Sequence, residues 1–359
     1  MSLLRRLVPA CAVVTAVSWA AACVAPPGAG DGGPAPDPAS SARLVERTYV
    51  TMGSELRLSA WTPDERAAAA AFGEVFDEFD RLDRLMSVWK PGSDVLRMNA
   101  AAGTRPVDVS PEVLEALRVA RQVGDWTGGK FDVTFGALSD IWKFDHDRDG
   151  VVPGRAQIEA RLPLVDYAAI RVDEARGSVF LPRPGMRVHL GGIGKGLAVD
   201  RAVAILRGRG LRDFMIQAGG DFYAAGHRGG RPWRVGIQDP RGHAGAVFAA
   251  LDLSDATFST SGDYERAFVK DGRRYHHLLD PDSGEPARGC RSVTIVADRA
   301  VLADALSTGV FVAGPDAGMA LIERLPNVEG VIVTARNEVL VSSGLRGRLE
   351  ILSQPGDAP

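Results

Sequence analysis

A glycine-rich turn that contains one lysine is the part of the sequence best suited to binding a ligand. Glycines occupy positions 191, 192, 194 and 196, and Lys195 lies among them. Before the turn, Met186, Val188 and Leu190 alternate with polar residues, which predicts a strand, and after it apolar residues recur at helical spacing. A strand that turns through glycines into a helix exposes backbone N–H groups and the positive end of the helix dipole. The stretch therefore suits a phosphate or pyrophosphate.

The familiar nucleotide-binding patterns do not fit this turn. A P-loop requires a glycine where this chain has His189, and Ser or Thr where it has Gly196. A Rossmann fingerprint requires two residues between its last two glycines, whereas Gly194 and Gly196 are separated by one. A glycine-rich turn that binds nothing is the alternative interpretation of the segment taken alone.

A carboxylate and a hydroxyl four residues apart form a second candidate site. The sequence predicts a helix from about Arg299 to Phe311, on which Asp304 and Thr308 share one face. Hard oxygen ligands of this kind suit Mg²⁺. A surface hydrogen bond is the alternative when the pair is considered without further support.

Two other side chains could take part in chemistry, and one acidic run is excluded. His277 could accept a proton because an unperturbed histidine has a pKa of about 6.5, although a structural hydrogen bond is its default role. Trp89 could stack on a flat ring. Asp145–Asp149 superficially suggests a calcium loop, but it lacks the glutamate that such a loop requires, so we expect a solvated loop there.

The elements that must position these residues begin with helices in the first half. Thr62-Pro63-Asp64-Glu65 predicts a helix with a capping box and Pro at the first helical position, and an apolar stripe continues from Phe72 to Met86. Ser110-Pro111-Glu112 predicts a second helix that ends before Thr127. We expect strand structure in Val45–Ala60 and in Lys130–Thr134.

Strands in hairpins dominate the second half. Asp271-Gly272 is a strong turn signal between two apolar runs. The expected strands are Phe214–Gln217, a strand through Trp233, Val235 and Ile237, Phe268-Val269, Tyr275–Leu279, Ser292–Ala297, Gly330–Thr334 and Glu338–Ser342. This distribution predicts an α+β fold, a single large domain of largely antiparallel sheets flanked by helices.

Composition limits the function classes. The chain has 359 residues, of which 45% are hydrophobic, enough for a substantial core. Its net charge of −3 gives no electrostatic footprint for nucleic acid, so we expect no nucleic-acid partner.

The N-terminus resembles an export signal. Arg5 and Arg6 precede the apolar stretch Leu7–Ala22, and small residues lead directly to Cys23, which we expect to be lipidated. Cleavage after Ala22 into a secreted protein without lipid is the alternative. We expect a signal peptide in 1–22, the lipidated cysteine and a flexible tether in 23–43, the folded domain in 44–352 and a tail in 353–359. These features predict an exported lipoprotein that is anchored to the membrane through Cys23.

The remaining cysteines support no intramolecular disulfide. Cys11 lies in the signal segment, Cys23 would carry lipid, and Cys290 would then be alone. We expect Cys290 to be a partly buried small residue.

Eight short motifs occur in an order that resembles the ApbE family, over about residues 45 to 350. They are Met52-Gly53, Met86-Ser87-Val88-Trp89, Gly129-Lys130-Phe131-Asp132-Val133-Thr134, Leu190-Gly191-Gly192-Ile193-Gly194-Lys195-Gly196, Ala218-Gly219-Gly220-Asp221, Ser259-Thr260-Ser261-Gly262-Asp263-Tyr264, His277-Leu278-Leu279-Asp280-Pro281 and Ala303-Asp304-Ala305-Leu306-Ser307-Thr308. Any one motif is weak, whereas the ordered set is specific.

The resemblance implies an FAD:protein FMN transferase with an ApbE-like, T-fold-related domain. Such an enzyme uses Mg²⁺, cleaves FAD, attaches FMN through a phosphoester to a Thr or Ser of a target protein, and releases AMP. The resemblance also implies a membrane-anchored lipoprotein on the periplasmic or outer cell-surface side. The implied metal ligands are Asp304, Thr308 and the carbonyl of Gly192, and His277 is the implied catalytic residue. The implied FAD-binding residues are Met52, Trp89, Lys130, Phe131, Asp132, His189, Lys195 and Leu278.

One residue departs from the family pattern, and two other functions remain open. The family commonly has Asp at the position of His189, and a neutral histidine can donate or accept a hydrogen bond where Asp only accepts. An Mg-dependent FAD pyrophosphatase, which gives FMN and AMP, is one alternative. A non-catalytic FAD-binding lipoprotein is the other, and the presence of Asp304, Thr308 and His277 argues against it.

Overall fold

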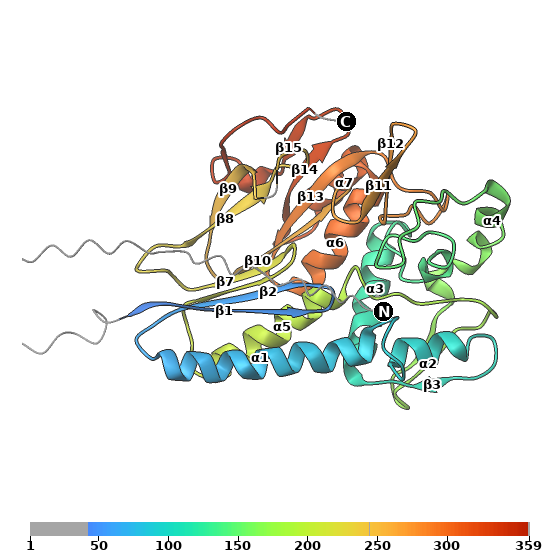
Figure 1. Ribbon diagram of the computed structural model, residues 1–359, viewed down its shortest axis with the longest axis horizontal. Helices are drawn as coiled ribbons and strands as arrows, with labels where there is room; N and C mark the ends of the chain where they lie inside the picture. Colours follow the sequence, from blue (N-terminus) through green and yellow to red (C-terminus); the bar gives the residue numbers. More distant parts are fainter. Residues whose placement is uncertain (1–41, 244, 358–359) are drawn as a thin grey trace, which may run out of the picture. The chain divides into compact units, whose positions relative to one another are not determined.

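An eight-stranded antiparallel sheet organises the part of the chain that the structure describes. The computed structural model describes residues 42–243 and 245–357. The strands of this main sheet lie in the same order as they occur along the chain, and every neighbouring pair is antiparallel (Figure 1). The predicted α+β class is therefore confirmed. The strands are β1 (Arg43–Thr51), β2 (Ser54–Thr62), β6 (Phe214–Ala218), β7 (Asp221–Ala225), β10 (Ala256–Gly262), β13 (Cys290–Ala297), β14 (Glu329–Thr334) and β15 (Val339–Val341).

Smaller strand groups branch from this meander. One three-stranded sheet consists of β3 (Val107–Asp108), β5 (Ser178–Phe180) and β4 (Arg171–Asp173). A second consists of β16 (Glu350–Ile351), β9 (Val247–Leu253) and β8 (Trp233–Gln238). The predicted hairpin at Asp271-Gly272 is confirmed as β11 (Ala267–Lys270) paired with β12 (Arg273–His276).

Helices cover one face of the main sheet. Helix α1 packs on β1 and β2, and α5 packs on β6 and β7. Helix α6 packs on β10 and β13, and α7 packs on β14. Their apolar sides form the main core with the sheet, and the α1 residues Phe72, Phe79 and Leu82 are fully buried in it. The helices are α1 (Glu65–Met86), α2 (Asp94–Ala100), α3 (Pro111–Trp126), α4 (Arg155–Glu159), α5 (Gly194–Gly208), α6 (Ala300–Ala313) and α7 (Pro315–Arg324).

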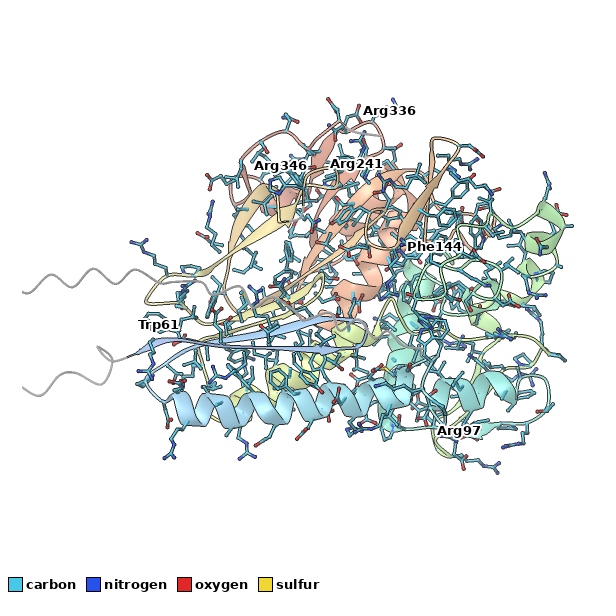
Figure 2. All side chains as sticks on the ribbon, viewed as in Figure 1. Trp61, Arg97, Phe144, Arg241, Arg336 and Arg346 are labelled. Carbon is cyan, nitrogen blue, oxygen red and sulfur yellow. The ribbon has the colours of Figure 1, made fainter. Side chains whose placement is uncertain are left out.

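Two further cores lie outside the main one. The sheet of β8, β9 and β16 contributes Trp233 and Phe248 to a second core, which includes Phe258 of the main sheet. A third cluster, which we call the satellite core, contains Leu138, Trp142, Phe144, Ile158 and Leu279, and the β11–β12 hairpin packs against it. Phe144 is labelled in Figure 2. The segment around 135–165 thus has a small core of its own.

The helix predictions are largely confirmed, with one shifted start. Helix α3 begins at Pro111 behind the N-cap Ser110, and its cap at the other end is Thr127, as expected. Helix α1 begins at Glu65 rather than at Pro63, because the Asp64 carboxylate caps the helix by accepting from the Ala67 N–H at 2.9 Å.

Two segments predicted as strands are irregular. Lys130–Thr134 forms bends and a turn, because the Asp132 carboxylate accepts from the backbone N–H groups of Thr134 at 2.7 Å and Tyr167 at 2.9 Å. Met186–Leu190 keeps the predicted alternation of buried side chains but belongs to no named strand. There the Asn99 side chain bonds both backbone groups of Val188, at 2.7 and 3.0 Å, in place of a neighbouring strand.

Three smaller features complete the description. Strand β12 ends at His276 rather than at Leu279, which instead forms a bridge with Pro286. Cys290, expected to be partly buried, is a fully buried free thiol. No helix within the described ranges is both long and apolar enough to cross a membrane. Cys23, the signal segment and most of the tether lie outside the described residues.

Candidate active site

A cavity of about 780 Å³ brings together most of the residues singled out in the sequence. Its lining includes residues at the start of α5 and on α6, and it also includes residues of the segment that carries the satellite core. The predicted site residues that line it are Trp89, Lys130, Phe131, Asp132, His189, Gly192, Lys195, His277, Leu278, Asp304 and Thr308.

Met52 is the predicted residue among those described that does not line the cavity. It lies in the turn between β1 and β2 with a positive φ of 49°, and its side chain packs against the main core. The next two residues, Gly53 and Ser54, line the cavity instead. The turn is therefore at the site even though the Met52 side chain is not exposed there.

Lys195 lies in the first turn of α5 between two buried carboxylates. Its Nζ is 2.5 Å from Asp221 Oδ2 and 3.9 Å from Asp304 Oδ1. Asp221 is held in turn by the Ser259 hydroxyl at 2.5 Å. Burial opposes the charged form of Lys195, but the two carboxylates outweigh it and hold its pKa above the ordinary value. Lys195 is therefore a fixed positive charge within the cavity wall.

Asp304 is fixed by the close approach of two helices. Its Oδ2 accepts from the Gly196 N–H at 2.9 Å, so the start of α5 holds a carboxylate of α6. A Cβ at position 196 would overlap the carbonyl oxygen of Ala300, which explains why glycine is required there. Burial and the neighbouring Asp221 raise the pKa of Asp304 to about 7, although Lys195 opposes the shift. A cation beside Asp304 would relieve this unfavourable burial of charge.

The oxygen groups around Asp304 have the chemistry that Mg²⁺ requires. The Thr308 hydroxyl is 3.0 Å from the Ser261 hydroxyl, and a Cβ at Gly192 would lie 3.3 Å from the same Thr308 oxygen. Mg²⁺ commonly takes one or two carboxylates and completes its shell with water and substrate phosphate. Among the residues described, no group of three His, Cys, Asp or Glu side chains forms a closed cage. The donor set thus fits an Mg²⁺ ion shared with a phosphate ligand.

Two histidines face the cavity, and burial lowers the pKa of both. His189 accepts a hydrogen bond from the Gly191 N–H at its Nδ1, at 3.0 Å, and its pKa falls to about 4. The pKa of His277 falls to about 3, through burial first and then through the positive charge of Arg266. Its Nδ1 is buried and has no hydrogen-bond partner within the described residues. Both rings are therefore neutral at pH 7, and the pKa of His277 lies well below that of an unperturbed histidine.

Lys130 and Asp132 are already engaged in structural contacts. Lys130 bonds Asp280 and Asp282, each at 2.8 Å, and so ties its turn to the loop that follows His277. Asp132 holds its own turn through Thr134 and Tyr167, as described above. These two residues line the cavity while they stabilise its wall.

Trp89 lies at an exposed position of the cavity wall. Its side chain is 50% exposed, and its ring meets that of His146 edge-on with the centroids 4.3 Å apart. His146 belongs to the acidic run 145–149, which forms an irregular loop, as expected. A flat ring bound in the cavity could stack on the free face of Trp89.

Several site residues were missed by sequence reasoning. Asp221 and Ser261 lie in quoted motifs but had no role assigned, and their pairing with Lys195 and Thr308 depends on strands that are distant in the sequence. Asn99, within α2, and Arg266, just before β11, gave no signal, because a single polar residue has no distinctive spacing. Taken together, the site offers a fixed cation, a magnesium-type oxygen set and a neutral base around one cavity.

Comparisons with known proteins agree with this arrangement. Residues 52–332 match the model of the ApbE family. An FAD:protein FMN transferase of Klebsiella pneumoniae (strain 342) is 32% identical over 314 residues, which cover 87% of this chain and 96% of that protein. Another, of Treponema pallidum (strain Nichols), is 31% identical over 326 residues, 86% of this chain and 90% of that protein.

Solved structures give the same result. The crystal structure of the ApbE protein from Thermotoga maritima has 32% sequence identity and a TM-score of 0.79, and the match covers 85% of this chain and 99% of that one. The flavin transferase ApbE from Vibrio cholerae has 27% identity and a TM-score of 0.77, with 86% and 99% covered.

Proposed function

The chain belongs to the ApbE family, and from that membership we propose that it is an FAD:protein FMN transferase. In the proposed reaction, a Thr or Ser hydroxyl of an acceptor protein attacks the phosphorus on the FMN side of FAD. A P–O bond to the acceptor forms, the P–O bond to the AMP half breaks, and AMP leaves with the electron pair. The products are AMP and an acceptor that carries FMN through a phosphoester.

The observation that carries this proposal is the convergence of Lys195, Asp304, Thr308 and His277 on one cavity. Its volume of about 780 Å³ is in the range of pockets that hold a cofactor-sized ligand. The wall residue Lys195 supplies positive charge for the phosphates. The first N–H groups of α5 are already bonded, that of Gly194 to the Leu190 carbonyl oxygen and that of Gly196 to the Asp304 carboxylate, so they hold the metal-site carboxylate rather than the phosphates.

We also propose that Asp304, Thr308 and the carbonyl of Gly192 hold the Mg²⁺ ion. When bound, the ion would neutralise charge on the phosphate oxygens of FAD. The chain's own contribution is to keep Asp304 in place through the Gly196 N–H and to keep Lys195 charged beside it. Asp221, which bonds Lys195, positions that lysine and does not need to touch the substrate.

His277 is the proposed acceptor of the hydroxyl proton. Its ring is neutral in the free protein, so it has a lone pair available for a proton. The negative charge of a bound diphosphate would raise its pKa from the low value of the free protein and make it a stronger base. Trp89, Phe131, His189, Lys130, Asp132 and Leu278 are the proposed contacts to FAD.

A direct assay tests this function. Purified protein is incubated with Mg²⁺, FAD and a domain bearing an acceptor Thr, and the acceptor mass and the nucleotide products are measured. A transferase gives AMP and an acceptor heavier by one FMN phosphoester. Asp304→Ala is expected to lower metal affinity and turnover together, because it removes the charged ligand.

The same assay separates the alternatives. AMP and free FMN, with several acceptors left unmodified, would identify a pyrophosphatase. Tight FAD binding without turnover on any acceptor would identify a binding protein.

We further propose that the protein is exported and anchored to the membrane through lipid on Cys23, on the periplasmic or outer cell-surface side. The support is the N-terminal sequence, in which a positive region and an apolar stretch precede small residues and a cysteine. Its partners would then be FAD, the membrane, and an acceptor protein in the same compartment.

A further inference from the structure

Arg266 lines the cavity and has no role in the mechanism described so far. It directly precedes β11, opposite His277 at the open end of the hairpin, and its carbonyl oxygen accepts the His277 backbone N–H at 3.1 Å. Its guanidinium reaches Gly53 in the β1–β2 turn, where Nη2 would be 3.7 Å from a Cβ. The side chain lines the cavity and is 37% exposed. It is therefore within the space that a ligand would occupy.

The other basic residues of the cavity are less able to respond to a ligand. Lys195 lies between Asp221 and Asp304, and Lys130 bonds Asp280 and Asp282, so each lysine already faces two carboxylates. Arg187 is exposed, and its charge is screened by solvent. Arg266 faces two neutral histidines, and among the described residues its one ion pair is with Asp145.

The partner of Arg266 lies on a different part of the fold. Arg266 Nη1 is 2.7 Å from Asp145 Oδ1, and Asp145 belongs to the loop that also brings His146 against Trp89. Both members of the pair are partly exposed, and such a pair contributes little to folding stability. A guanidinium also has five donors in a planar fork that matches phosphate oxygens, so Arg266 can exchange a carboxylate for a phosphate.

We propose that Arg266 binds the diphosphate of FAD and that Asp145 is its resting partner, displaced when the ligand enters. This inference rests on the proposed function, because it names a further binding residue of the same site. Asp145 competes with the ligand for Arg266, and it prevents an unpaired cation from facing the two histidines in the empty cavity. Because only a phosphate ligand can replace Asp145 in this pair, the affinity for FAD would depend on its phosphates more than on its flavin ring.

We predict that replacing Arg266 and replacing Asp145 have opposite effects on the affinity for FAD. Arg266→Gln should weaken FAD binding by on the order of 10- to 100-fold, the usual range for a lost hydrogen bond to a charged group. It should change riboflavin binding by less than about twofold, because riboflavin has no phosphate. Asp145→Asn should instead tighten FAD binding, because Arg266 then has no carboxylate competitor.

The affinities are measured by flavin fluorescence in EDTA, so that no turnover occurs, together with the melting temperature of each variant. Arg266→Lys keeps the positive charge but lacks the planar guanidinium, so its affinity for FAD should lie between those of wild type and Arg266→Gln. Arg273→Gln removes an exposed hairpin arginine that pairs with Glu285 outside the cavity, and it should bind FAD like wild type.

Two results would overturn the inference. If Asp145→Asn weakens FAD binding as Arg266→Gln does, the pair is a structural support. If wild type binds riboflavin as tightly as FAD, Arg266 does not recognise the diphosphate. Both results come from binding measurements and do not depend on FMN transfer. If the protein binds FAD but modifies no acceptor, the proposed function is contradicted, and the binding measurements still test the role of Arg266.

Discussion

At the scale of single residues, His277 is the proposed acceptor of the hydroxyl proton. Its Nδ1 is buried without a hydrogen-bond partner among the described residues, and buried polar groups rarely remain so without a reason. The neighbouring His276 also has a buried Nδ1 without such a partner, but its Nε2 bonds the Ala287 carbonyl oxygen at 2.8 Å. Of the two histidines, His277 lines the cavity and His276 does not. The contrast favours a functional role for His277 and a structural one for His276.

We therefore predict that His277→Asn slows the reaction and leaves the ligands bound. The expected loss of turnover is about 10²- to 10⁴-fold, the range for a missing general base. FAD and Mg²⁺ affinities should stay close to wild type, because Lys195 and Asp304 are unaffected. Single-turnover kinetics and equilibrium binding, measured on the same preparations, test this. A variant that reacts at the wild-type rate would remove His277 from the mechanism.

The same variant makes a prediction about pH. His277 gains its proton near pH 3 in the folded protein and at about pH 6.5 in the unfolded chain. Between these values the unfolded chain holds the extra proton, so folding stability decreases as the pH falls, by up to about 1.4 kcal/mol per pH unit for one group. His277→Asn should reduce that slope in the ligand-free protein.

Urea unfolding at pH 7 and pH 5 measures the slope. His189 and His276 have lowered pKa values too, so part of the acid destabilisation should remain. Asp304 has a raised pKa and acts in the opposite direction, but it is present in both proteins and cancels in the comparison. His227→Asn, at an exposed histidine, is the control, and an equal change in its slope would contradict the explanation.

The sequence could identify residues whose spacing follows a local element. Asp304 and Thr308 share a helix face, and Lys195 lies in a glycine turn, so each could be named before the structure. Arg266 could not, because its ion pair with Asp145 joins two residues that are far apart in the chain and meet only in the fold. The type and spacing of residues can therefore indicate candidate binding residues, whereas the partners that compete for a side chain depend on tertiary contacts.

At the scale of elements, the site depends on how closely α5 approaches α6. Gly196 is the contact point, and its N–H holds Asp304. We predict that Gly196→Ala costs about 1–3 kcal/mol, the range for overpacking, because the new methyl group would overlap the Ala300 carbonyl oxygen and force the helices apart. Mg²⁺ affinity should fall with stability, since Asp304 would lose its position.

A glycine at the other end of the same helix supplies the control. Gly208 ends α5, and a Cβ added there would have nothing within 4 Å, so Gly208→Ala should be neutral or slightly stabilising. Urea unfolding and a metal titration compare the two variants. Equal effects would mean that the loss of glycine itself matters, and not the contact between the helices.

Elements were predictable where their own side chains determine them. The stripe from Phe72 to Met86 and the caps of α3 are local signals, and both elements formed as expected. Lys130–Thr134 and Met186–Leu190 have strand-like patterns, but Asp132 bonds the Thr134 N–H and Asn99 bonds both backbone groups of Val188. The two stretches of chain meet at one isolated bridge, between Phe135 and Arg187, and do not form a named strand pair. A side-chain amide or carboxylate thus overrides a local preference.

At the scale of the molecule, the main sheet is a meander from which the site-bearing segments branch. The chain between β2 and β6 carries α1 to α5, and the chain between β10 and β13 carries the hairpin beside Arg266 and His277. The sequence predicted antiparallel hairpins and one large domain. It did not predict which strands would leave the main sheet, because hairpin signals specify a strand's neighbour and not its sheet.

The last prediction concerns the N-terminal segment that precedes this domain. If Cys23 carries lipid, Cys23→Ser should move the protein from the membrane fraction to the soluble fraction of the cell. Transfer activity per molecule should be unchanged, because every site residue lies in the domain that begins after the tether. Fractionation, intact mass and the transfer assay on the released protein measure these effects.

Cys11→Ser is the matched control, since Cys11 lies within the same apolar stretch but not beside the small residues that precede Cys23. It should leave the protein in the membrane fraction, because an apolar signal segment tolerates the change of one small residue. An unmodified Cys23 in the mass of the membrane form would refute lipid attachment. The protein would then have to reach its acceptor by some other means than a lipid anchor.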